Sequence, residues 1–334
     1  MARNSKNPAL LLEALTIGSL HFAAVGSLPD QLRAMNDEAA MLAERARDPW
    51  HLAFVGALRG MQEYVAGDLA GSMATLRTAI DAFSRLGDEA TAGLFEISFS
   101  EVAELRGEIG EATTAMARAL VVDTECGFRS STVLRAVLCW LAGRNGETER
   151  ALDLGREVVA LAHQPFNPVI RAQALFALGV AETLAGLTDP AAEHLGEALH
   201  IHEQVGMVRE AAMDHRHIGE LCQMQGRSSE ARDHHRRAVE LAVQVGLPWT
   251  VMLAARSMSR TIVDNDPELA CQLLGNTETI SEVFGYLPTP DEQRLIDEVR
   301  ATATEHLGAS AVTRATEAGA LLDYRQLDQL VANA

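Results

Sequence analysis

Two pairs of charged residues stand at helical spacing and could do chemistry. Glu101 and Glu104 are three positions apart, so they share one face of a helix. Paired carboxylates can carry out acid–base catalysis or bind a cation, but a solvated acidic face is the simpler interpretation. Arg216 and Glu220 are four apart and pair most simply with each other. Arg216 could instead hold an acidic group of a ligand.

Histidines gather in one segment of the chain. Seven of the eleven fall between His194 and His235. A metal site and a pH sensor are the functional interpretations. No two of these histidines stand four residues apart, the spacing of a helical ligand pair, although contacts between helices could still join some of them. We therefore expect solvated histidines, and neither a metal nor a cofactor.

Other chemical motifs are sparse. The four cysteines include no CxxC pair, which favours reduced, packed thiols in a cytoplasmic protein. The formal net charge of −18 opposes binding to phosphate backbones, so no direct nucleic-acid partner is expected. Lys6 is the only lysine, which excludes a GxxxxGK[ST] phosphate loop. Neither a signal peptide nor a membrane span is predicted. No catalytic residue is assigned, and we expect a protein that is not an enzyme.

The elements that carry these residues are marked by regularly spaced glycines. One series recurs about every 40 residues, and a second series lies 20 residues after most of its members. The first series is Gly26, Gly67, Gly107, Gly146, Gly186, Gly226 and Asn265; the second is Gly87, Gly127, Gly206, Gly246 and Gly285. Two turns per period predict stacked helical hairpins in an all-α solenoid.

Small residues recur at fixed distances from these glycines. Five residues after the first series come Ser72, Ala112, Ala151, Ala191, Ala231 and Ala270. Seven residues before it stand Gly60, Ser100, Cys139, Gly179 and Gly219. A helical glycine costs about 1 kcal/mol relative to alanine, so its recurrence at one phase predicts close helix crossings.

This pattern of small residues, glycines and alanines resembles the tetratricopeptide repeat, in the longer, roughly 40-residue variant of the maltose-regulon activator and related bacterial regulators. The match is strong from about 50 to 246 and weaker in the first repeat, where Gln31 replaces an alanine. The resemblance implies a right-handed α-α superhelix of about seven units.

The C-terminal part resembles the end of large actinobacterial multidomain transcriptional activators of the LuxR and antibiotic-regulatory types. The matching features, over roughly 265–331, are Asp266-Pro267-Glu268-Leu269-Ala270, Leu273-Leu274-Gly275 and Leu287-Pro288-Thr289-Pro290-Asp291-Glu292. The phosphate loop and a basic helix-turn-helix of that family are not found here, so its ATPase and DNA-binding activities do not transfer. The resemblance therefore implies that this chain corresponds to the helical sensor region of those activators.

In tetratricopeptide arrays the first helix of each hairpin lines a concave surface. Mapped onto this chain, that surface is apolar and aromatic with a few polar groups, which predicts a groove for a peptide, a helix or an apolar small molecule. Packing in the core is the alternative for each residue. The candidates are Phe54, Met61, Tyr64, Ile97, Glu101, Glu104, Trp140, Phe176, Arg216 and Glu220.

These observations predict three regions: an N-terminal helix over 1–25, repeats over 26–285, and C-terminal capping helices over 286–334. They favour a non-catalytic regulatory or sensor protein that binds a protein or peptide partner and is linked to transcription. The alternatives are a sensor of a small apolar metabolite and an unusual enzyme with a solenoid cavity. The apolar N-terminal helix over 8–25 is expected either to cap one end of the array or to form the contact of a homodimer.

Overall fold

The computed structural model describes residues 7–25, 29–126, 131–162, 167–246 and 248–332. These residues form α-helices, one short 3-10 helix and the turns between them, and no strand occurs in the described ranges. The helices are α1 (Pro8–Val25), α2 (Pro29–Ala46), α3 (Pro49–Ala66), α4 (Leu69–Leu86), α5 (Glu89–Leu105), α6 (Ile109–Cys126), α7 (Ser131–Arg144), α8 (Thr148–Ala162), α9 (Pro168–Leu184), α10 (Thr188–Val205), α11 (Val208–Met224), α12 (Ser228–Val245), α13 (Pro248–Ile262), α14 (Pro267–Phe284), α15 (Pro290–Leu307), α16 (Ala309–Ala320), η2 (Tyr324–Gln326) and α17 (Leu327–Val331).

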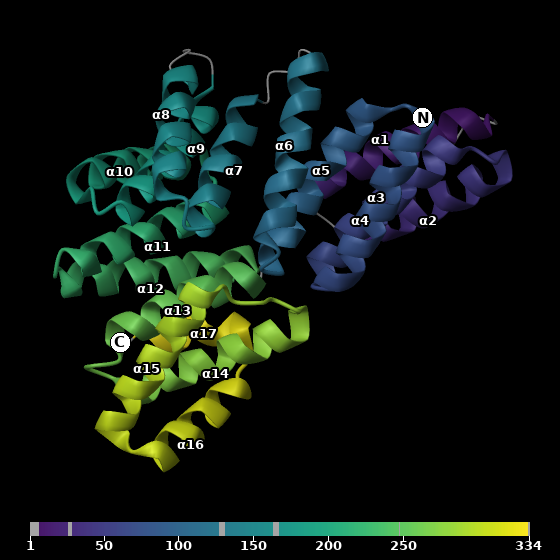
Figure 1. Ribbon diagram of the computed structural model, residues 1–334. Coiled ribbons are helices and arrows are strands. Elements are labelled where there is room, and N and C mark those ends of the chain that lie inside the picture. Colours follow the sequence, from purple (N-terminus) through teal and green to yellow (C-terminus); the bar gives the residue numbers. More distant parts are fainter. Residues whose placement is uncertain (1–6, 26–28, 127–130, 163–166, 247, 333–334) are drawn as a thin grey trace. The chain divides into compact units, whose positions relative to one another are not determined.

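The helices pack mainly on their neighbours in sequence and form two compact units. Unit 1 comprises Met1–Ser131 and unit 2 comprises Thr132–Ala334. Within unit 1 the closest pairs are α3 with α4 and α5 with α6; within unit 2 they include α9 with α10 and α11 with α12 (Figure 1). The predicted all-α array of helical hairpins is confirmed. The boundary between the units falls inside the predicted repeat region.

The glycine spacing marks the ends of helices, as predicted. Gly67 and Gly87 have φ angles of 88° and 77°, the left-handed conformation that glycine adopts without steric cost. The aspartate after each glycine then starts the next helix: Asp68 accepts a hydrogen bond from the backbone N–H of Gly71, and Asp88 from that of Thr91. Gly26 and Gly127 lie outside the described residues.

Arg47 occupies the place where this spacing would put another glycine, 20 residues before Gly67. Its φ angle is 53°, and it is the one non-glycine residue in the described ranges with a positive φ. Its N–H bonds to the carbonyl of Glu44, as the N–H of Gly67 bonds to that of Tyr64. The turn at Arg47 therefore has the same geometry as the turn at Gly67, although a residue with a side chain disfavours this left-handed conformation.

The recurring small residues lie at close helix crossings, which confirms that prediction. A Cβ atom at Gly60 would lie 2.8 Å from Cγ of Leu76, and one at Gly179 would lie 2.7 Å from Cγ of Leu195. The thiol of Cys139 is buried and donates to the carbonyl of Ala151 at 3.1 Å, so this cysteine packs as predicted.

The C-terminal helices pack back against earlier helices of unit 2. Gly275 of α14 and Gly319 of α16 each face backbone of the opposite helix so closely that neither has room for a Cβ atom. Leu327 and Val331 of α17 are fully buried in a cluster that includes Val239 of α12. No helix in the described part of the chain is long and apolar enough to cross a membrane.

Candidate ligand-binding site

The ten residues predicted to bind a ligand divide between the two units. Phe54, Met61, Tyr64, Ile97, Glu101 and Glu104 belong to unit 1, and Trp140, Phe176, Arg216 and Glu220 belong to unit 2.

Phe54 belongs to the core of unit 1 and does not line an open surface. It is 6% exposed, and its ring packs edge-on against Phe83 and Phe95, with centroids 6.4 and 5.4 Å away. Trp50 stacks on Phe54 and donates its indole N–H to Asp88 at 2.7 Å. Phe54 is therefore a core residue, which is the alternative that the sequence left open for each candidate.

Two of the predicted residues of unit 1 contact each other. The hydroxyl of Tyr64 on α3 donates to Oε1 of Glu101 on α5 at 2.7 Å. Glu101 and Glu104 are both half-buried on α5. Met61 and Ile97 are half-buried as well.

In unit 2 the two predicted aromatic residues meet at His217. Trp140 of α7 and Phe176 of α9 stack with centroids 6.1 Å apart. The ring of His217 on α11 lies edge-on to both, at 5.4 Å from Trp140 and 5.3 Å from Phe176. The aromatic pair therefore covers a buried imidazole rather than an apolar core alone.

His217 is hydrogen-bonded between the predicted ion pair. Arg216 donates to a carboxylate oxygen of Glu220 at 2.8 Å, which confirms the pairing. Arg216 also donates to Nε2 of His217, so the ring proton must be on Nδ1, which lies 3.1 Å from Oε2 of Glu220. Ser257 of α13 donates to the same carboxylate at 3.0 Å.

Charge and burial fix the protonation states of this group. Burial and the neighbouring Arg216 charge lower the pKa of His217, so the imidazole is neutral. Burial alone would raise the pKa of Glu220, but the charge of Arg216 holds it well below its ordinary value. Glu220 is therefore an ionised carboxylate that already has three hydrogen-bond donors.

The histidines do not form one cluster, and several are buried, so the expected solvated faces are wrong for them. His202 bonds to Asp214 at 2.7 Å, and both are buried. His235, with no exposed surface, lies between the carbonyl of Arg216 and the hydroxyl of Thr261. Among the described residues no group of three or more potential ligands is arranged to hold a metal ion.

A pocket adjoins the Arg216–Glu220 pair within unit 2. Its cavity volume is about 70 Å³, and the space around it is open to solvent. Residues from α11, α13, α14 and α15 line it: Arg216, Glu220, Gln223, Leu253, Arg256, Ser257, Ser259, Arg260, Leu274, Glu292, Leu295, Ile296 and Val299. Its lining combines charged groups with aliphatic side chains.

Glu292 brings a second ion pair to this pocket. It closes the capping box of α15 with Thr289 and accepts hydrogen bonds from Arg144 at 2.6 Å and from the hydroxyl of Tyr286 at 2.9 Å. Burial alone would raise the pKa of Glu292, but the charge of Arg144 lowers it. Burial raises the pKa of Tyr286 to about 12, so its hydroxyl stays protonated.

Sequence reasoning missed Arg256, Arg260 and Glu292. Arg256 and Arg260 stand four apart, as Arg216 and Glu220 do, and this spacing could have singled out a cationic helix face in so acidic a chain. Glu292 offered no such signal, because its partner Arg144 is 148 positions away.

Solved structures of helical-repeat proteins resemble this chain. A Rap protein complexed with competence and sporulation factor superposes with a TM-score of 0.71 at 13% identity, over 98% of this chain and 89% of that one. Aspartyl phosphate phosphatase F from Bacillus subtilis gives a TM-score of 0.59 at 14% identity, over 87% of this chain and 76% of that one.

A signal-transduction ATPase with a tetratricopeptide repeat sensor, from Pyrococcus horikoshii, gives a TM-score of 0.50 at 12% identity, over 99% of this chain and 52% of that one. No family model matches the sequence, and no curated protein matches it either. At these identities the likeness establishes the fold: this is a tetratricopeptide-like helical-repeat protein.

Proposed function

We propose that this protein is a non-catalytic regulator that binds a short peptide, or a peptide segment of a partner protein, in the pocket of unit 2. The observation that carries the proposal is the pocket itself. It offers hydrogen-bonding and charged groups beside aliphatic ones, the combination that fits a peptide with polar backbone and mixed side chains. The fold is that of a Rap protein whose structure contains competence and sporulation factor.

A small apolar metabolite fits this pocket less well. An apolar ligand would bury the guanidinium groups of Arg256 and Arg260 without offering them hydrogen bonds, and desolvating charged groups is costly. The aromatic pair Trp140–Phe176 contacts the imidazole of His217.

The charge states of the group beside the pocket support a binding role. A general base needs a pKa near the working pH. The pKa of Glu220 is well below that range, and its oxygens are held by Arg216, His217 and Ser257. His217 is committed on both ring nitrogens. Because these side chains already have hydrogen-bond partners, they are suited to form a rigid wall of a binding site.

We place this role in the cytoplasm and in transcriptional regulation. The cytoplasm agrees with four free cysteines, three of them buried. The link to transcription rests on the resemblance of the C-terminal segment to multidomain activators. Comparing transcripts between the host and a strain that lacks the gene tests it: an unchanged transcript profile would remove this part of the proposal.

The experiment for peptide binding uses the full chain and a pool of short synthetic peptides of random sequence. The protein is separated by gel filtration, and the retained peptides are identified by mass spectrometry. Leu295→Trp, a half-buried pocket residue, should fill the pocket and abolish retention. Val283→Trp is the matched control, because Val283 is 67% exposed in the same unit and does not line the pocket. Retention that survives Leu295→Trp, or no retention at all, would overturn the proposal.

A further inference from the structure

The pocket of unit 2 contains an arginine whose charge is not matched by a carboxylate. Arg256 is half-buried, and its hydrogen bonds go to neutral hydroxyls, Thr277 at 3.5 Å and Ser281 at 2.7 Å. Its guanidinium lies over the ring of Tyr286 at 5.1 Å. Its Nη1 is buried without a hydrogen-bond partner in the described part of the protein.

The acidic groups around Arg256 are already engaged by other arginines. Glu292 is paired with Arg144, and Glu278 with Arg300. Glu220, which also lines the pocket, is paired with Arg216. The charges of Glu292 and Glu278 therefore act on Arg256 at a distance, but neither carboxylate forms an ion pair with it.

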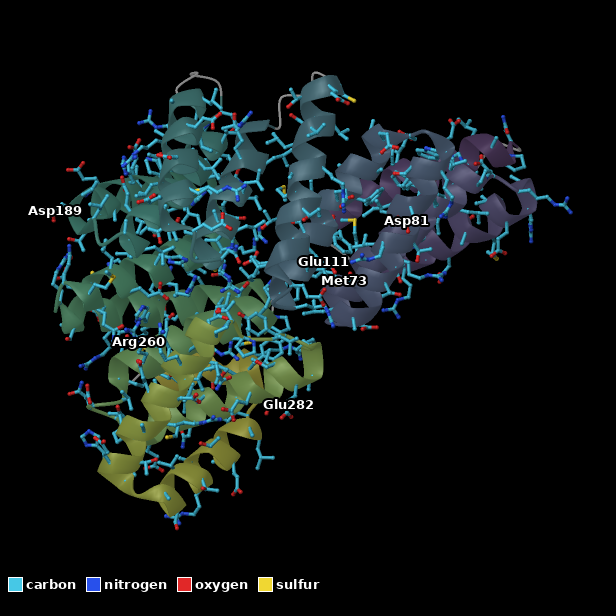
Figure 2. The ribbon with its side chains drawn as sticks, viewed as in Figure 1. Met73, Asp81, Glu111, Asp189, Arg260 and Glu282 are labelled. Carbon is cyan, nitrogen blue, oxygen red and sulfur yellow. The ribbon has the colours of Figure 1, made fainter. Side chains whose placement is uncertain are left out.

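A second arginine extends this cationic face. Arg260 is one helical turn further along α13, lines the same pocket and is exposed. It is labelled in Figure 2. No carboxylate in the described ranges forms an ion pair with it. Two arginines at this spacing repel each other slightly, and a shared anion removes that repulsion.

We infer that the pocket recognises a carboxylate of the bound peptide, either an acidic side chain or the free C-terminus, through Arg256 and Arg260. This inference rests on the proposed peptide-binding function and adds the chemical class of the ligand. A planar guanidinium matches a carboxylate with two parallel hydrogen bonds, and the guanidinium groups of Arg256 and Arg260 both belong to the pocket lining. A singly charged carboxylate suits the site better than a doubly charged phosphate, because Glu220 and Glu292 also line it.

The test compares two pools of short, C-terminally amidated peptides on the full chain. One pool contains Asp and Glu, and the other carries Asn and Gln at the same positions. We expect the acidic pool to be retained about tenfold better by the wild-type protein. A free-acid version of the Asn/Gln pool distinguishes the C-terminus from a side chain as the source of the carboxylate.

Arg256→Met should abolish the preference for the acidic pool, and Arg256→Lys should restore part of it. Thr277 and Ser281 keep backbone carbonyls as acceptors, at 2.8 and 2.9 Å, so the Met variant leaves no hydroxyl unpaired. Arg260→Gln, at an exposed position, should reduce the preference by about threefold. Arg314→Met, an exposed arginine of α16, is the control and should change nothing.

The possible failures are distinguishable with a second probe, N-acetylglutamate methylamide, whose binding is followed by the NMR signals of arginine side chains. Equal retention of both amidated pools and of the free-acid pool would overturn the carboxylate inference and leave peptide binding intact. If no pool is retained but the probe shifts Arg256 signals, peptide binding fails and anion recognition holds. If neither binds, both are wrong.

Discussion

Nδ1 of His217 lies 3.1 Å from a carboxylate oxygen of Glu220, while Nε2 of the same ring accepts a hydrogen bond from Arg216. The imidazole therefore bridges the two members of an ion pair that are adjacent on one helix turn. This arrangement holds three side chains of α11 in fixed positions beside the pocket of unit 2.

Replacing Glu220 by Gln should destabilise unit 2. The substitution removes the charge that offsets the buried guanidinium of Arg216 and weakens charge-assisted hydrogen bonds. We expect the free energy of unfolding to fall by about 1.5–3 kcal/mol in chemical denaturation. The control is Glu240→Gln, in the solvent-exposed pair with Arg237, where a change below about 0.5 kcal/mol is expected. Equal effects of the two variants would contradict this view of the network.

His235 should remain neutral well into the acidic range. Burial lowers its pKa to about 4, from an ordinary value of 6.5. Because the folded pKa is the lower one, its contribution to stability is present above pH 6.5 and is lost as the pH falls through 4. NMR titration of the Cε1 proton should give a midpoint near 4, and a midpoint near 6.5 would refute the buried neutral state.

The titration of Asp214 changes the stability in the opposite direction to that of His235, over nearly the same pH range. Burial raises its pKa to about 6, from 3.8. Its contribution to stability is therefore present below pH 3.8 and is lost as the pH rises through 6. We expect Asp214→Asn to remove this loss, so that the variant gains stability relative to wild type as the pH rises from 4 to 7. Denaturation curves at several pH values measure it; a constant difference would contradict the raised pKa.

Replacing either of two glycines of unit 2 by alanine should change the free energy of unfolding, in opposite directions at the two positions. At Gly179 a Cβ atom would collide with Leu195, so Gly179→Ala should lower the free energy of unfolding by about 1–3 kcal/mol. Gly196, on α10 with open space around it, should gain about 0.5–1 kcal/mol from the same change. Thermal denaturation of both variants checks this. Stabilisation at Gly179 would mean that the helices do not cross as closely as described.

Arg47→Gly should stabilise unit 1, unlike most glycine substitutions. The left-handed φ of 53° disfavours a residue with a side chain by about 1–2 kcal/mol, and the greater freedom of glycine in the unfolded chain offsets part of this. A net gain of about 0.5–1 kcal/mol in chemical denaturation is expected. Arg45→Gly, in the last turn of α2, is the control and should not stabilise unit 1.

The repeat was predictable because its signals are local. Glycines such as Gly67 and Gly87 mark helix ends through their own backbone conformation, and Arg216 and Glu220 pair because one helical turn separates them. The contact of Trp140 with Phe176 required only the repeat phase.

The pocket was not predictable because it depends on distant contacts. Arg256 lacks a carboxylate partner because other arginines engage the carboxylates near it, among them Arg144, which pairs with Glu292 of α15. The buried state of His217 likewise depends on side chains from α7 and α9. Neither fact is encoded in spacing along one helix.

Photo-crosslinking measures most directly where a peptide binds. The full chain is irradiated with the random peptide pool carrying a diazirine residue, and crosslinked fragments are identified by mass spectrometry. Peptide binding in unit 2 predicts crosslinks concentrated on α11, α13 and α15, in fragments next to Arg216, Arg256 and Leu295. Crosslinks confined to other helices, or scattered without preference, would contradict it.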